Sequence, residues 1–364
     1  MQILLVLAFV AVFPMQPALA ETANSAAFWP AVQARCDATA AKDPSDTGKR
    51  IARAAIDEFY RFGGHEIDAD GRLFRFGRTE AEHAPEYGGS RPAQLGDLGW
   101  WRVKEYWRSL YGKDFADKLE VRGYRGGAEA ADGKQDAELL RPHAADVLRA
   151  ADTVTDPALR EVLREAALRA AIIDTPWSAA FISYIVKQAG GKADAFEFAN
   201  AHRAFIYDAF AVSAAENDGK DSPRLYRACP VFSTRPRAGD LICFQREAAL
   251  ANESDGSVRE TIRGEVAEKS TAHAVRRTHC DVVAAVDPSA QKLYAIGGNV
   301  EQAVAVKKLN LRDGLKFSSM QNGRCGGPGH WTLPRPSDAA AGDALRGGDC
   351  SLNDRKWFVL LQMR

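Results

Sequence analysis

The chain has 364 residues, in which 48 Lys and Arg balance 48 Asp and Glu. This neutral balance gives no reason to expect nucleic acid or an anionic membrane surface as a partner. The length suits one large domain or two ordinary ones.

The N-terminus has the pattern of an export signal. An apolar run over residues 3–13 is followed by Ala18-Leu19-Ala20, which places small residues at the positions that signal peptidases require. The run is too short to cross a bilayer, and no later apolar stretch is long enough to do so. We therefore predict a signal peptide at residues 1–20, a periplasmic or secreted protein, and no membrane span.

Residues 21–135 are predicted to form a helical N-terminal region that packs on the rest of the chain. Apolar residues recur at helical spacing over 47–62 and again over the aromatic stretch 97–111. On the second of these helices, Trp101 and Tyr106 are candidates to line one wall of a cleft. The intervening Asp68-Ala69-Asp70-Gly71 lacks the acidic residue that would complete a calcium loop, so a hairpin turn is the better interpretation. Glu80 and Glu82 are expected in a solvated loop.

Residues 136–364 are predicted to form an α+β domain, in which a helical cluster is followed by an antiparallel sheet. The expected helices are 136–151, 156–173, 176–189 and 194–211. The expected strands are 240–246, 280–287, 292–296, 303–309 and 356–363. Two insertions interrupt the strands, at 247–278 and 310–355, and the first is expected to be a surface loop or a lid.

The stretch from Asp174 to Ser183 carries the most specific signal. Asp174 or Thr175 suits the N-cap of a helix and Pro176 suits its first turn, so Ser178 lies among free backbone N–H groups at the positive end of the helix dipole.

Four segments resemble the CHAP and NlpC-type branch of the papain-like hydrolases. Pro176-Trp177-Ser178-Ala179-Ala180-Phe181-Ile182 resembles the nucleophile helix of that branch, with Ser178 in place of the catalytic cysteine. Segments 237–244, 278–283 and 296–300 follow in the family's order and resemble its Gly-Asp-Leu strand, its histidine strand and its Gly-Gly-Asn segment. The chain also resembles a bacterial family of unknown function within this superfamily, in which the serine form is expected.

The resemblance implies a papain-like fold and a nucleophile with a base. A serine hydroxyl needs a histidine to take its proton during attack, and His279 is the candidate. On a strand His279 and Asp281 share a face, so either Asp281 or Asn299 is expected to orient the imidazole. Trp177 and His202 are candidates for substrate contacts, although a packed or solvent-facing position is the favoured interpretation of His202.

Two functions remain open from the sequence. The first is an exported hydrolase of amide bonds, which the resemblance directs to peptidoglycan peptides. The second is a catalytically inactive module that binds peptidoglycan or a protein partner, because the thiol is missing. Retention of His279 and Asn299 favours the first.

The six cysteines of an exported chain permit disulfides. Cys325 with Cys350 is the first expected pair, and Cys243 with Cys280 is either a cross-strand pair or two buried thiols. Cys36 and Cys229 remain. Because no Cys-x-x-Cys motif and no histidine spacing of the ligand type occur, neither a metal nor another cofactor is predicted.

Overall fold

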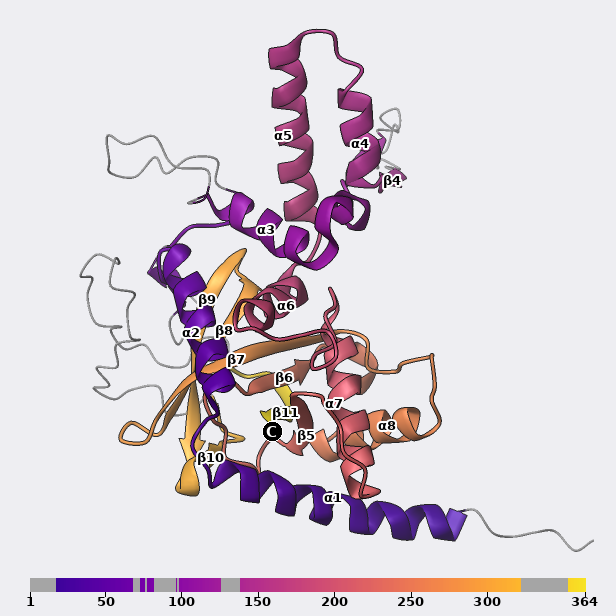
Figure 1. Ribbon diagram of the computed structural model, residues 1–364, viewed down its shortest axis with the longest axis vertical. Coiled ribbons are helices and arrows are strands. Elements are labelled where there is room, and N and C mark those ends of the chain that lie inside the picture. The colour runs from indigo at the N-terminus through magenta and orange to yellow at the C-terminus, as the bar shows by residue number, and fades with distance from the viewer. Residues whose placement is uncertain are drawn as a thin grey trace, which may run out of the picture.

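The protein is described by a computed structural model that covers residues 18–67, 73–75, 77–81, 96, 98–125, 138–321 and 353–364, with the side chains of residues 18–26, 66–67, 73–75, 124–125 and 138 left out. These residues form a mixed α+β structure in which helices cover a large sheet (Figure 1). The predicted α+β class is therefore confirmed.

The main sheet has the strand order β2-β1-β9-β8-β7-β6-β11-β5, and β10 pairs with β9 off this path. Neighbouring strands are antiparallel except that β1 runs parallel to β9. The strands are β1 (His65–Ile67), β2 (Leu73–Arg75), β5 (Tyr226–Pro230), β6 (Leu241–Gln245), β7 (Thr278–Asp287), β8 (Lys292–Val300), β9 (Ala303–Arg312), β10 (Lys316–Phe317) and β11 (Lys356–Met363). A separate hairpin joins β3 (Gly123–Arg125) to β4 (Glu138–Leu140).

The five strands predicted over 240–246, 280–287, 292–296, 303–309 and 356–363 are confirmed as β6, β7, β8, β9 and β11. β5 was not predicted, because its five residues include Arg227 and Pro230, which are unfavourable in a buried strand. β1 and β2 pair with each other, and residues 68–71, where a hairpin turn was predicted, lie outside the described residues.

The N-terminal part supplies helices to the same body. They are α1 (Ala18–Ala40), α2 (Asp46–Arg61) and α3 (Gly99–Tyr111), followed by the short helix η2 (Gly112–Lys118). α2 begins at a Ser45 cap whose side chain accepts from the Gly48 N–H. Apolar residues of α2 and α3 share one core with the sheet, so this region is integrated into the fold.

The remaining helices are α4 (Ala144–Ala151), α5 (Pro157–Asp174), α6 (Ser178–Gln188), α7 (His202–Asn217) and α8 (Asp255–Ala267), with short turns η3 (Ala248–Leu250) and η4 (Asp313–Leu315). α7 begins eight residues later than the helix predicted from residue 194, because residues 194–201 form turns that end at His202. The insertion at 247–278 holds α8, whose Val258 and Ile262 are buried against the core, so this segment is a packed helix.

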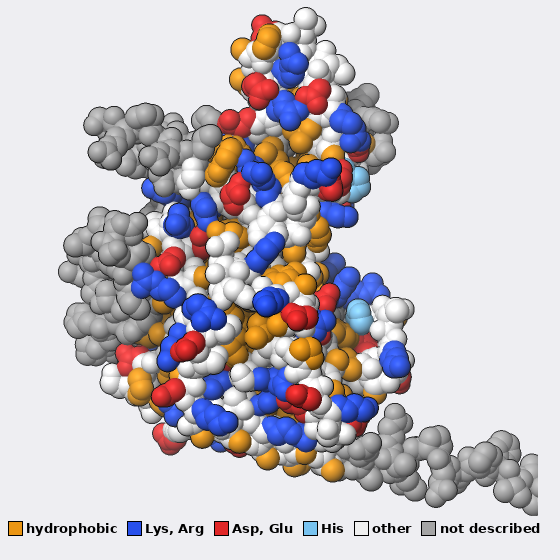
Figure 2. Space-filling model, in the orientation of Figure 1, with side chains coloured by type: hydrophobic (Ala, Val, Ile, Leu, Met, Phe, Trp, Pro, Cys, Tyr) orange, Lys and Arg blue, Asp and Glu red, His pale blue; other side chains and the backbone are white. Residues whose placement is uncertain are grey.

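α4 and α5 form a hairpin that projects from the body (Figure 1). α5 carries apolar side chains that are not covered there, since Leu159, Val162 and Leu163 are all exposed. Over the rest of the face seen in Figure 2, positive and negative side chains are interspersed, as the neutral charge balance leads one to expect.

Apolar residues pack on both faces of the sheet. α2, α3, α6 and α7 contribute to the larger cluster with residues such as Phe181, Leu241 and Val282. α1 contributes Phe28 and Val32 to a second cluster with Ile242, Phe244 and Trp357. Because consecutive strand residues point to opposite faces, the same strands serve both clusters.

Two disulfides are present among the described residues. Cys36 of α1 is bonded to Cys229 of β5, and Cys243 of β6 is bonded to its direct cross-strand neighbour Cys280 of β7. The Cys36–Cys229 pairing is confirmed, and the alternative of two buried thiols at Cys243 and Cys280 is excluded. Cys325 and Cys350 lie outside the described residues.

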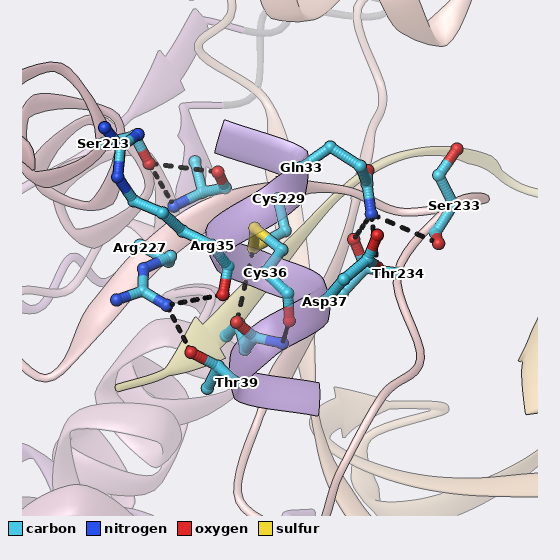
Figure 3. The surroundings of a disulfide bond; sticks show 12 residues. Gln33, Arg35, Cys36, Asp37, Thr39, Ser213, Arg227, Cys229, Ser233 and Thr234 are labelled. Carbon is cyan, nitrogen blue, oxygen red and sulfur yellow. Dashed lines mark hydrogen bonds between the residues drawn. A yellow bond between two sulfur atoms is a disulfide. The ribbon is translucent and has the colours of Figure 1, made fainter. Parts of the chain in front are cut away.

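The Cys36–Cys229 disulfide lies in a polar seam between α1 and the sheet (Figure 3). Arg227 donates to Thr39 Oγ1 and pairs with Glu216, while Gln33 Nε2 donates to the Ser233 carbonyl and to Thr234 Oγ1. The covalent bond and these hydrogen bonds together hold α1 against the edge strand.

Candidate functional site

Ser178 is the first residue of α6, at the position predicted from the sequence. Its side chain is half-buried, whereas Trp177, Ala179 and Ala180 on either side are buried. Because α6 begins here, the first backbone N–H groups of the helix have no carbonyl acceptor within the helix. A partly accessible hydroxyl is thus held beside free donors.

The hydroxyl of Ser178 is hydrogen-bonded to His202, with 2.8 Å between Oγ and Nε2. His202 is the first residue of α7, is buried, and contacts the edge of Phe205. His279, the predicted base, is hydrogen-bonded to Asp281, and the histidine that contacts the Ser178 hydroxyl is His202. Ser178 and His202 meet where their two helices begin, whereas His279 contacts the ring of His202.

The imidazole ring of His279 contacts the ring of His202, with 4.9 Å between the two ring centroids. Its Nε2 lies 3.0 Å from Asp281 Oδ1. Asp281 in turn accepts from Lys307, whose Nζ lies 3.0 Å from each carboxylate oxygen. Of the two predicted orienters, Asp281 is thus the one that contacts His279.

The strand pairing explains this row of polar side chains. His279 and Asp281 alternate on β7 and so share a face, and Lys307 comes from β9, two strands away. The intervening strand β8 carries Gly297 at this point. A Cβ atom there would lie 1.9 Å from Asp281 Oδ1 and 3.1 Å from His279 Nε2. The absence of a side chain at Gly297 makes the contact between the two outer strands sterically feasible.

Burial sets the charge state of these groups. Desolvation lowers the pKa of His279 to about 4 despite the opposing effect of Asp281. Desolvation, reinforced by His279, also lowers the pKa of His202 well below its usual value. Burial by itself raises the pKa of Asp281, but Lys307 and His279 outweigh it and hold the carboxyl ionised. Both imidazoles are therefore neutral at pH 7.

A cavity of about 550 Å³ opens against His279. Ser178 and His202 do not line it. The lining residues are Phe244, Gln245, Arg246, His279, Asn299, Val300, Glu301, Lys307, Asp354, Arg355 and Lys356. Asn299 has a left-handed backbone conformation, with φ of 54°, and shares this cavity with His279.

The predicted substrate contacts Trp177 and Tyr106 are placed in the core instead. Trp177 is fully buried and its indole donates to Glu80, while the buried Tyr106 hydroxyl donates to Glu58 Oε2 at 2.6 Å. The two rings lie 5.8 Å apart and support α6 from beneath. Trp101 lies at a different cavity, between α3 and α5.

Sequence patterns missed Glu80 and Lys307. Glu80 was expected to be solvated, but it is 2 % exposed, and desolvation raises its pKa to about 7 although the Trp177 hydrogen bond lowers it. Lys307 and Lys308 interrupt the apolar stretch Ala303–Leu309, and a lysine in a buried strand was the available signal that it needs a partner.

Within the described part of the chain, no group of three or more His, Cys, Asp or Glu side chains has a metal-binding arrangement. No helix among those residues is long and apolar enough to cross a membrane.

Comparison with known families gives one result. The family model described as an uncharacterized protein conserved in bacteria, DUF2272, matches residues 95–363. That range includes Ser178, His202, His279, Asp281 and Lys307. No curated protein matches the chain. No solved structure matches it either.

Proposed function

This chain belongs to the bacterial family DUF2272, and we propose that it is an exported serine hydrolase that cleaves amide bonds. One observation carries the proposal: the Ser178 hydroxyl lies 2.8 Å from the Nε2 atom of a buried imidazole, His202. A serine becomes a nucleophile only when a neighbouring base takes its proton, and this distance is within the range for that transfer.

The neutral tautomers fit the transfer. When the Ser178 O–H donates to His202 Nε2, the ring proton of His202 is on Nδ1. As Oγ attacks the amide carbonyl, its proton moves to His202 Nε2 and the carbonyl oxygen becomes an oxyanion. The backbone N–H groups at the start of α6 stabilise that charge.

The second half of the reaction restores the site. His202 gives the proton to the leaving nitrogen as the carbon–nitrogen bond breaks, which leaves an ester on Ser178 and releases the amine product. Water then attacks the ester, with His202 again taking a proton, and the carboxylic acid product leaves as the serine hydroxyl is restored.

Of the buried groups near His202, Asp281 favours the charge that develops on that ring, whereas His279 and Lys307 oppose it. The Asp281 carboxylate raises the pKa of His202 and so favours its protonated form, while Lys307 acts in the opposite direction. His279 fills the space between Asp281 and His202 and is held by its hydrogen bond to the carboxylate. Asp281 is therefore a positioning residue that acts through His279.

Peptidoglycan peptides are the proposed substrate. The support is the resemblance of residues 174–310 to the CHAP and NlpC-type papain-like hydrolases, which by fold-level analogy implies a papain-like core and an envelope substrate. The disulfides Cys36–Cys229 and Cys243–Cys280 are compatible with an exported protein, since such bonds persist in oxidising compartments.

Labelling with an uncharged fluorophosphonate tests the nucleophile. We expect the wild type to be labelled on Ser178 and the Ser178→Ala variant not to be labelled. Ser257→Ala is the matched control, because Ser257 is also in the first turn of a helix but is exposed, and its hydroxyl is hydrogen-bonded to the Ser254 hydroxyl and not to a histidine. Labelling that persists in Ser178→Ala would contradict the assignment.

Digestion of purified sacculi, followed by mass spectrometry of the released fragments, tests the substrate. Fragments that disappear with Ser178→Ala and with His202→Gln would establish the hydrolase and identify the bond. If only Ser178→Cys releases fragments, the natural chain is an inactive module that binds the same substrate. Labelled protein that releases nothing would exclude peptidoglycan as the substrate.

A further inference from the structure

The cavity beside His279 has a positively charged wall. Four of its lining residues are cationic, namely Arg246, Lys307, Arg355 and Lys356, and two are acidic, Glu301 and Asp354. Lys307, which lines the cavity, already forms an ion pair with Asp281. Arg246 and Arg355 are exposed residues, so their guanidinium groups can contact a ligand in the cavity.

These two arginines converge on one aromatic ring. Arg246 follows β6 and Arg355 precedes β11, and the two strands are hydrogen-bonded neighbours. Their guanidinium carbons lie 5.1 and 5.9 Å from the centroid of Phe244, which itself contacts the His279 ring at 5.2 Å. The ring of Phe244 therefore contacts both arginines on one hand and His279 on the other.

Neither arginine is neutralised within the described part of the chain. No ion pair or side-chain hydrogen bond involves Arg246 or Arg355 there, although most other arginines near the core have a carboxylate or carbonyl acceptor. The pKa of Arg246 is lowered, first by desolvation and also by the charge of Arg355, with Asp281 opposing both. Two like charges held together without an acceptor are stabilised by a bound anion.

We propose that Arg246 and Arg355 form a subsite for a carboxylate of the substrate, at the cavity next to His279. The inference rests on the proposed hydrolase function and names the substrate class more closely: a peptide that carries a free carboxylate a residue or more away from the amide that is cut. Guanidinium groups bind carboxylates through paired, charge-assisted hydrogen bonds, which a primary amide in the same position cannot replace.

The position of the subsite agrees with this chemistry. Ser178 is separated from the cavity by His202 and His279, and each residue of an extended peptide spans roughly 3.5 Å. The carboxylate therefore belongs to a neighbouring residue of the substrate and not to the group that is attacked. Glu301 and Asp354 at the same cavity disfavour a second negative charge on the ligand.

Binding to the full-length Ser178→Ala protein tests the subsite without turnover. The probes are acetyl-Ala-Ala-Ala with a free C-terminal carboxylate and the same peptide with a C-terminal carboxamide, titrated by calorimetry at low salt. We expect the acid to bind at least roughly tenfold more tightly than the amide. Adding Arg246→Gln and Arg355→Gln is expected to abolish that preference, whereas Arg149→Gln on the distant α4 is expected to preserve it.

Equal binding of the two peptides, or no measurable binding of the acid at millimolar concentration, would overturn the subsite. So would a preference that survives in the folded double-arginine variant. If that variant does not fold, the comparison of acid with amide in the parent protein still decides the matter. Fluorophosphonate labelling of the wild type is measured in parallel, so a failure of the hydrolase proposal is seen as absent labelling and is distinct from a failure of the subsite.

Discussion

The Ser178 Oγ atom lies 2.8 Å from the Nε2 atom of His202, and each residue is the first of its helix. Thirteen residues of turn and loop separate the end of α6 from the start of α7. The chain thus returns so that two helix N-termini face each other, and the reactive pair lies where they meet. His279 is a second layer behind that pair.

The first prediction separates the roles of the two histidines. His202→Gln is expected to slow fluorophosphonate labelling of Ser178 by roughly 100-fold or more, because the proton acceptor is lost. His279→Gln is expected to cause a smaller loss, since that ring acts through His202. Labelling rates measured side by side test the order, and a larger loss with His279→Gln would make His279 the base.

The second prediction concerns the pH dependence of labelling. Desolvation, His279, Arg246 and Lys307 all lower the pKa of His202, and Asp281 alone among the facing groups raises it. The base therefore stays neutral as the pH falls through 6.5, the usual pKa of histidine. We expect the labelling rate to be retained at pH 5.5, and a decline centred near pH 6.5 would show that a solvated histidine is responsible.

The third prediction uses Gly297, where a Cβ atom would meet the Asp281 carboxylate at 1.9 Å. Gly297→Ala is expected to displace Asp281, to slow labelling, and to lower the free energy of unfolding by roughly 1–3 kcal/mol. Gly264→Ala is the control, because it lies in α8 with open space around it and is expected to add up to about 1 kcal/mol. Unchanged labelling and stability in Gly297→Ala would contradict the close contact.

The fourth prediction concerns Glu80 beneath α6. Its folded pKa is raised to about 7 by desolvation, so its protonated form favours folding, and this stabilisation is complete below pH 4.5 and lost as the pH rises through 7. Glu80→Gln keeps an acceptor for the Trp177 indole without a charge. We expect it to raise the thermal midpoint at pH 8 and to change it little at pH 4.5.

The control for Glu80→Gln is Glu268→Gln, at an exposed position after α8. That change is expected to leave the midpoint unaltered at both pH values. Parallel melting curves for wild type and Glu80→Gln at pH 4.5 and 8 would show that Glu80 is not titrating in the folded protein near pH 7.

The fifth prediction concerns the disulfide between α1 and β5. Cys36 and Cys229 are 193 residues apart, so their bond constrains a long loop of the unfolded chain. The double change Cys36→Ala and Cys229→Ala is expected to lower the free energy of unfolding by roughly 2–5 kcal/mol. Urea unfolding of the two proteins gives the difference, and coincident transitions would contradict a stabilising role.

Local sequence patterns determined much of the fold. Short runs of apolar residues predicted β6, β7, β8, β9 and β11, most of whose residues are buried because both faces of the sheet are covered. Helical spacing predicted α2, α3, α5 and α6, and Ser178 lies in the first turn of α6 as predicted. The predicted N-cap at Asp174 or Thr175 is wrong, because the N-cap of α6 is Trp177 and Thr175 is the C-cap of α5. These features depend on residues within one turn or one strand, and a sequence displays them directly.

The composition of the site was decided by tertiary structure. That Ser178 bonds to His202 and not to His279 depends on how α7 packs against α6, and no spacing along the chain encodes that packing. Asp281 and Lys307 come from the strands on either side of β8. They can meet because the residue of β8 between them is Gly297, which has no side chain. Such contacts follow from the strand order and from the need of each buried charge for a partner. The position of that partner is fixed only in the folded chain.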